Sequence, residues 1–167
     1  AASAPSLANF PGASEEVVAS AFAVVEQMKE STFGFKTFFF EASVTGFVDS
    51  RYERVVRVAL ATGDSGATFS RHLAPIVSVA PDAYKYHGLD EAKLDELGAC
   101  DATEALSDMV AFIEEQSDGR PTLVVGWKHA FALSCLVETM RDCKVPTEVL
   151  EDARYLDVMN VAPDAVV

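Results

Sequence analysis

The chain has 167 residues, half of them hydrophobic, which is enough to bury the core of one folded domain and excludes a wholly disordered protein. No apolar run approaches the ~20 residues that a membrane-spanning helix needs, so we expect no membrane insertion. The net charge of −13, with no basic patch in the sequence, disfavours direct electrostatic binding of nucleic acid.

The N-terminal region, residues 1–34, is predicted to hold an extended arm followed by an amphipathic helix. Small residues, proline and glycine dominate residues 1–13, and Ser14 is a typical N-cap residue. The helix predicted over 14–30 has an apolar stripe at spacings of three and four, formed by Val18, Phe22, Val25 and Met28. Such a helix either covers the sheet of its own domain or attaches to a partner, and the sequence leaves both open.

Three strands begin the second predicted region, residues 35–167. Residues 36–41 (KTFFFE) form a continuous apolar run, which is typical of a strand covered on both faces. Residues 53–62 are rich in β-branched side chains, 63–66 (GDSG) are typical of a turn, and 67–75 resume with alternating polarity. The last two runs therefore predict a hairpin.

Helices and strands alternate in the rest of the chain. Asp101 begins an amphipathic helix over 101–116, and a buried strand is predicted over 122–127. A second helix over 129–143 and a short strand over 153–159 follow. A three-strand meander followed by strands separated by helices predicts an α/β fold, with helices flanking a mixed sheet.

The three cysteines, Cys100, Cys135 and Cys143, form no CxxC pair. Cys135 and Cys143 lie about 12 Å apart along the axis of the predicted helix, which is too far for a disulfide. We therefore expect reduced thiols and an intracellular, reducing compartment. The sequence begins Ala-Ala-Ser-Ala-Pro-Ser without an initiator Met, which also fits a mature end after removal of a targeting peptide, and hence an organelle matrix.

Four local signatures occur in order between residues 35 and 162. They are Phe-Phe-Glu-Ala-Ser-Val-Thr-Gly at 39–46, His-Gly-Leu-Asp at 87–90 after Pro75, Trp-Lys-His-Ala-Phe-Ala at 127–132, and Tyr-Leu-Asp-Val-Met at 155–159. In this order and at these distances they resemble the motifs of the DnaQ-like, or DEDD, superfamily of 3′–5′ exonucleases. The resemblance implies a ribonuclease H-like mixed sheet, with a three-strand meander first and parallel strands afterwards.

The same resemblance indicates which catalytic groups are missing. Two-metal phosphodiester hydrolysis needs several carboxylates, which hold two divalent cations ~3.5–4 Å apart. Glu41 stands where the family has Asp, whereas Ser43 and Ala132 replace two further family carboxylates. The family's last motif, a His or Tyr with a further Asp, has no counterpart before Val167. The resemblance therefore implies the fold without the activity, with at most Glu41 left as a weak metal ligand.

Two residues at the junction of the predicted strand 122–127 and the predicted helix 129–143 are further candidates. His129 could serve as a base, although such a histidine is more often a cap or a surface residue. Its pairing with Cys135 as a nucleophile is disfavoured, because side chains six residues apart on a helix point in different directions. Trp127 stands where the family has His and could stack on a nucleic-acid base, but a core or interface aromatic is the commoner role.

These observations favour a non-catalytic exonuclease-fold domain, a pseudo-exonuclease, that serves as a structural or interaction subunit of a larger assembly. Its expected partners are other protein subunits, and no cofactor is expected. The alternative is a divergent metal-dependent 3′–5′ exonuclease acting on DNA or RNA with Mg²⁺ or Mn²⁺. In that case Asp49, Asp101 and Asp157 would have to stand in for the missing ligands.

Overall fold

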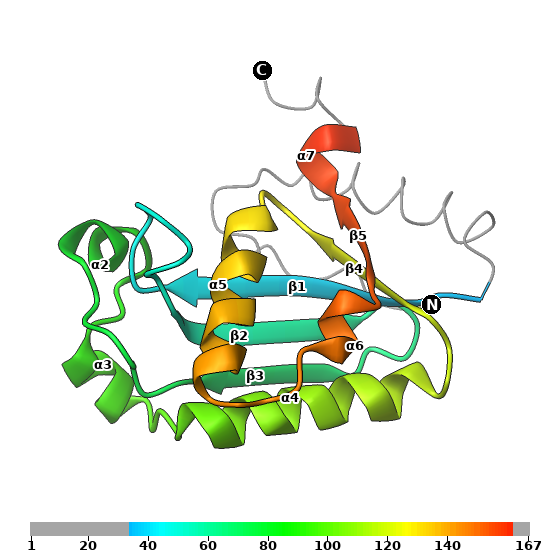
Figure 1. Ribbon diagram of the computed structural model, residues 1–167, viewed down its shortest axis with the longest axis horizontal. Coiled ribbons are helices and arrows are strands. Elements are labelled where there is room, and N and C mark those ends of the chain that lie inside the picture. Colours follow the sequence, from blue (N-terminus) through cyan, green and yellow to red (C-terminus); the bar gives the residue numbers. More distant parts are fainter. Residues whose placement is uncertain (1–33, 162–167) are drawn as a thin grey trace.

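A computed structural model describes residues 34–161, and the helix predicted over 14–30 lies outside this range. The described residues form a five-stranded mixed sheet in the order β3-β2-β1-β4-β5 (Figure 1). The first three strands form an antiparallel meander, and the last two run parallel to β1. The strands are β1 (Lys36–Val44), β2 (Val55–Thr62), β3 (Thr68–His72), β4 (Thr122–Gly126) and β5 (Arg154–Asp157). The predicted mixed sheet, a three-strand meander followed by parallel strands, is confirmed.

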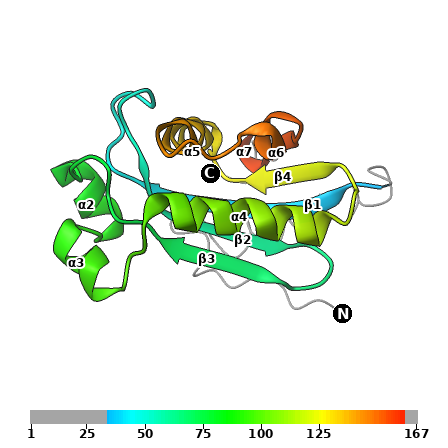
Figure 2. The ribbon, with the colours of Figure 1, turned by 60° about the horizontal axis from the view of Figure 1, so that its bottom comes forward.

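Three helices, α4, α5 and α6, cover one face of the sheet (Figures 1 and 2). We call it the helix-covered face, and the opposite side the second face. Two short helices, α2 and α3, lie beyond the end of the sheet, and α7 follows β5. The helices are α2 (Pro81–His87), α3 (Glu91–Glu96), α4 (Ala102–Ser117), α5 (Ala130–Asp142), α6 (Glu148–Glu151) and α7 (Val158–Val161). No helix among the described residues is long and apolar enough to cross a membrane.

The structure differs from the sequence-based prediction in its short helices. No helix is predicted from sequence over residues 81–96, where α2 and α3 form, or over the four residues of α6. The strand predicted over 153–159 ends at Asp157, where α7 takes over. Helices of four to seven residues complete at most two turns, so their apolar positions do not recur often enough to show a period.

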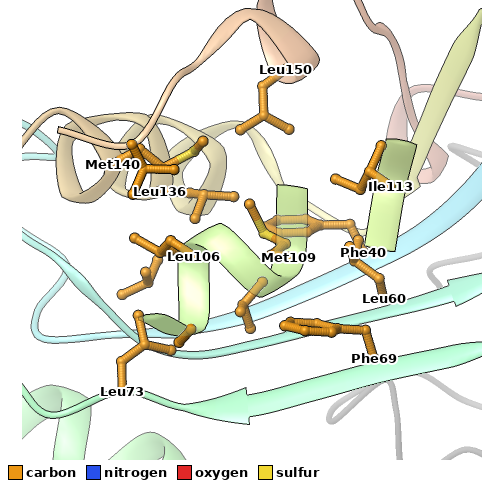
Figure 3. Close-up of a cluster of buried hydrophobic side chains, with 14 of the residues drawn as sticks. Phe40, Leu60, Phe69, Leu73, Leu106, Met109, Ile113, Leu136, Met140 and Leu150 are labelled. Carbon is orange, nitrogen blue, oxygen red and sulfur yellow. The ribbon is translucent and has the colours of Figure 1, made fainter. Parts of the chain in front are cut away.

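The long helix α4 illustrates how the sequence specifies the helix-covered face. The carboxylate of Asp101 accepts hydrogen bonds from the backbone N–H groups of Thr103 and Glu104, which caps the helix. Its buried stripe meets apolar side chains from the strands and from α5 and α6 (Figure 3). The labelled members of this core are Phe40, Leu60, Phe69, Leu73, Leu106, Met109, Ile113, Leu136, Met140 and Leu150.

Strand β1 is apolar on both of its faces, as its continuous run of phenylalanines predicts. Phe38 and Phe40 belong to the core of the helix-covered face. Phe39 points to the second face, where it packs with Leu123 and Val125. Its buried members Phe39, Leu123, Val125 and Val158, with the partly buried Phe35, Ala61, Trp127 and Leu156, are called the second-face cluster below.

Candidate functional site

A cleft of about 850 Å³ opens at the C-terminal end of β1. Its walls come from the ends of β1, β2 and β3, the loop between β1 and β2, helix α2, the connection from β4 to α5 and the start of α5. Residues singled out by the sequence line it, namely Glu41, Ser43, Trp127, His129 and Ala132. The structure therefore brings Glu41, Ser43 and Ala132, the three positions that the resemblance singled out, to one cleft.

The pleat of β1 and a bulge in β2 position the floor of this cleft. Glu41 and Ser43 lie two residues apart and so share the second face. Ser43 pairs with Arg57 of β2, but Val44 pairs with Val55, so Val56 is an extra residue in the ladder. Because Arg57 pairs with Ser43, the Arg57 side chain lies on the same face as Ser43 and Glu41.

Glu41 is paired with a cation of the protein itself. The Arg57 Nη1 donates a hydrogen bond of 3.1 Å to the Glu41 Oε2, and both side chains are half-buried. Burial raises the pKa of Glu41, while the nearby Arg57 charge and its hydrogen bond act in the opposite direction. Neither this ion pair nor a role for Arg57 is predicted by the sequence motifs.

The other two motif positions contribute no charge to the cleft. Ser43 is buried and offers only a hydroxyl, and Ala132 lies in the first turn of α5 with a methyl group alone. Within residues 34–161, no cluster of three or more His, Cys, Asp or Glu side chains is placed to hold a metal ion. The carboxylate chemistry of the described cleft therefore rests on Glu41.

The three aspartates considered as stand-ins are engaged elsewhere and do not line the cleft. Asp49 forms a salt bridge with Arg51 in the β1–β2 loop, and the hydrogen bonds from Arg51 lower the pKa of Asp49 to about 2. Asp101 caps α4. Asp157 accepts hydrogen bonds from the backbone N–H groups of Lys128 and Met159, so it links the end of β5 to the connection between β4 and α5.

His129 precedes α5 as predicted, but its side chain makes no capping bond and is only 5% exposed. Its Nδ1 lies 3.7 Å from the Asp157 Oδ2, beyond hydrogen-bond distance. A Cβ atom added at Gly126 would lie 2.8 Å from the His129 Cβ, so glycine is required for this close approach. Burial lowers the pKa of His129, although Asp157 acts against that shift. The side chain is part of a packed junction between β4, β5 and α5.

Two further residues considered from sequence, Cys135 and Trp127, pack against apolar clusters of the fold. Cys135 is fully buried, and burial raises the pKa of its thiol to about 12, so it carries no nucleophilic thiolate at neutral pH. Trp127 is half-buried: it belongs to the second-face cluster and also lines the cleft.

Two exposed aromatic side chains form the rim of the cleft, and the sequence analysis missed them. Phe47 of the β1–β2 loop is 44% exposed and Tyr86 of α2 is 68% exposed. Their rings meet edge to face with centroids 5.5 Å apart, and Phe131 of α5 lies 6.5 Å from Phe47. No sequence period marks these residues, because they come from a loop and from two different helices.

Comparisons with known proteins bear on the fold. No family model matches the chain, and no curated protein sequence does. Among similar solved structures are exonuclease I with the inhibitor BCBP, a product-bound exonuclease I, and the zinc-ion-bound form of the E. coli exonuclease I–single-stranded DNA complex. Each is 13% identical to this chain, with a TM-score of 0.62 over 76% of it.

The likeness covers 29%, 30% and 28% of the lengths of those three structures, respectively. At this identity it shows the fold alone: a mixed sheet with flanking helices, consistent with the ribonuclease H-like architecture.

Proposed function

We propose that this chain is a pseudo-exonuclease: a non-catalytic exonuclease-fold domain that serves as a structural or interaction subunit of a larger assembly. The observation that carries the proposal is the ion pair between Glu41 and Arg57 at the end of β1. The carboxylate in the first motif already has a cationic partner, and the neighbouring positions hold Ser43 and Ala132.

Electrostatics support this proposal. Mg²⁺ and Mn²⁺ are bound by several oxygen ligands, and two-metal hydrolysis needs enough carboxylates to offset two dications. Here a dication approaching Glu41 would meet the positive charge of Arg57 at the same carboxylate. Within the described cleft, the nearby Ser43 hydroxyl and Ala132 methyl group cannot offset that repulsion.

The rim of the cleft supports binding to a protein. Exposed aromatic side chains such as Phe47 and Tyr86 are enriched in protein interfaces. The net charge of −13 opposes a polyanionic ligand, so other protein subunits are the favoured partners and direct binding of nucleic acid is disfavoured.

The alternative is a divergent metal-dependent 3′–5′ exonuclease acting on DNA or RNA. The fold likeness to exonuclease I favours it. It requires Mg²⁺ or Mn²⁺, and it requires further carboxylates from residues outside 34–161 or from a partner, because the described cleft supplies only Glu41.

Calorimetric titration of Mn²⁺ at high salt separates the two functions. The samples are the wild type, Glu41→Gln, and Glu114→Gln as a control that removes an exposed carboxylate of α4. We expect the same weak, non-saturating heat in all three. A saturable site that only Glu41→Gln abolishes, together with Mn²⁺-dependent release of nucleotides, would overturn the proposal and establish the enzyme.

The interaction itself is tested by affinity purification of the full chain from extract of its native cells. We expect Phe47→Ser to lose co-purifying subunits, and Tyr52→Ser to retain them, because Tyr52 is also exposed on the β1–β2 loop but does not line the cleft. Retention of the same subunits by both variants would exclude the cleft rim as the contact.

A further inference from the structure

The second face of the sheet is buried at its centre although the described helices offer it little cover. Phe39, Leu123 and Val125 are 8%, 7% and 1% exposed. Helices α4, α5 and α6 lie on the opposite side of the sheet. Apart from strand residues and Phe35, only Trp127 and Val158 join the second-face cluster among residues 34–161. A sheet face with this burial needs a further covering element.

Small side chains beside this cluster leave room for bulky ones. On β2, Ala59 and Ala61 face the same side as Glu41 and Phe39, their partners on β1. With the neighbouring β3 residues they line a groove of about 310 Å³. The groove continues from the apolar cluster toward the ion pair of Glu41 with Arg57, so it runs along the direction of the strands.

The N-terminal residues of this chain match the face in length and in pattern. A helix over 14–30 measures about 26 Å at 1.5 Å per residue, and the nine residues of β1 span about 30 Å. For a helix predicted to end at residue 30, residues 31–35 leave a connection of ordinary length to β1. Gly34 has a φ of 98°, a left-handed conformation suited to reversing the chain just before β1.

We propose that residues 14–30 form a helix that packs across the second face of the same chain, antiparallel to β1. Its apolar stripe, including Phe22 and Val25, fills the groove and covers the second-face cluster. This direction also brings the acidic start of the helix, Glu15 and Glu16, toward the end of the face that carries Arg57 and His72. The proposal is independent of the proposed function, and it leaves the cleft rim, not this helix, for partners.

Photo-crosslinking in the full chain tests which surface the helix contacts. Benzoylphenylalanine replaces Phe22, and equal amounts of ¹⁵N-labelled and unlabelled chains are mixed before irradiation. We expect crosslinks to second-face residues within 37–43, 57–61 or 123–125, between fragments of the same isotope only. The same probe at position 23, about 160° around the helix from Val25, should give no crosslinks to the sheet.

Three outcomes of this experiment would overturn the proposal. Crosslinks between labelled and unlabelled fragments would assign the face to a second copy of the chain. Crosslinks from position 22 to other surfaces, or an equal yield of sheet crosslinks from positions 22 and 23, would remove the assigned contact. Each is read directly from fragment masses and does not depend on a destabilised variant.

A matched pair of substitutions gives an independent readout. Trp127 is the one tryptophan of the chain and packs against the second-face cluster, so its fluorescence reports on the cover. We expect Val25→Asp to shift its emission to longer wavelength and to raise binding of a hydrophobic dye several-fold. Ala23→Asp adds the same charge on the opposite side of the helix and should change neither; equal effects of the two would contradict the proposal.

Discussion

The two faces of β1 are built from adjacent residues, yet they are specified in different ways. On the helix-covered face, Phe38 and Phe40 join a continuous apolar core closed by α4, α5 and α6. On the second face, the apolar Phe39 is followed by Glu41 and Ser43, whose surroundings are an ion pair and an open cleft. The helix-covered face is stabilised by close apolar packing, whereas the end of the second face carries charged groups that need partners.

This contrast separates what maintains the fold from what would perform chemistry. An exonuclease of this architecture needs charged groups at the end of β1, and the fold itself does not. Ser43 and Ala132 line the cleft, and neither is among the ten core residues labelled in Figure 3. A sequence can therefore retain the sheet and its helices while the cleft takes another role, which is the relation between fold and function that we propose here.

The largest effect is expected on the helix-covered face. Leu106 of α4 is fully buried, so Leu106→Ala should lower the free energy of unfolding by about 2–5 kcal/mol, through lost apolar contact and a residual cavity. Urea unfolding measures this change. Glu115→Ala on the exposed side of α4 is the control and should stay within about 0.5 kcal/mol of the wild type. A loss below about 1 kcal/mol for Leu106→Ala would break the comparison between the two faces.

A smaller effect is expected at the ion pair of the second face. Arg57→Gln leaves the half-buried Glu41 without its cation and should cost about 1–3 kcal/mol. The double variant with Glu41→Gln should cost less than the sum of the two single changes, because each single change leaves one charge without its partner and the double variant leaves none. Strict additivity in this double-mutant cycle, measured by urea unfolding, would show that the two side chains do not interact.

The same variant has a defined pH dependence. The pKa of Glu41 is raised above that of the unfolded chain by burial, and Arg57 opposes the shift. Removing Arg57 raises it further, so the folded state binds a proton more readily than the unfolded state. The stability of Arg57→Gln should therefore fall more steeply than that of the wild type as pH rises from about 4.5 through the folded pKa.

How well the sequence predicts the pairing of two strands depends on the length of the connection between them. The GDSG turn at 63–66 is short, so it fixes the register of β2 on β3, and the Thr62 N–H donates to the Ala67 carbonyl as such a hairpin requires. Between β1 and β2 the chain makes a ten-residue connection followed by a bulge at Val56. Neither is encoded by a turn signature, so the pairing that places Arg57 beside Glu41 could not be read from the sequence.

The candidate site was also predictable only in part. Glu41, Ser43 and Ala132 were placed in one site by their motifs, and they do line one cleft. The inward position of His129 was not predictable, because it depends on the close approach of Gly126 and on the end of β5, which is distant in the sequence. Tertiary contacts of this kind decide whether a histidine at a helix start caps, reacts or packs.

The smallest of these effects is expected at His129, because Asp157 partly offsets the burial that lowers its pKa. The folded state then takes up a proton less readily than the unfolded state, so stability should rise with pH from the folded pKa to about 6.5 and be lost on acidification. His129→Gln should flatten this dependence in urea unfolding between pH 5 and 7. His72→Gln tests the half-buried histidine of the cleft, whose pKa burial also lowers. An unchanged slope in both variants would show that protonation of neither His129 nor His72 contributes to the pH dependence of stability. The junction of β4, β5 and α5 would then accept a proton on His129 without loss of stability.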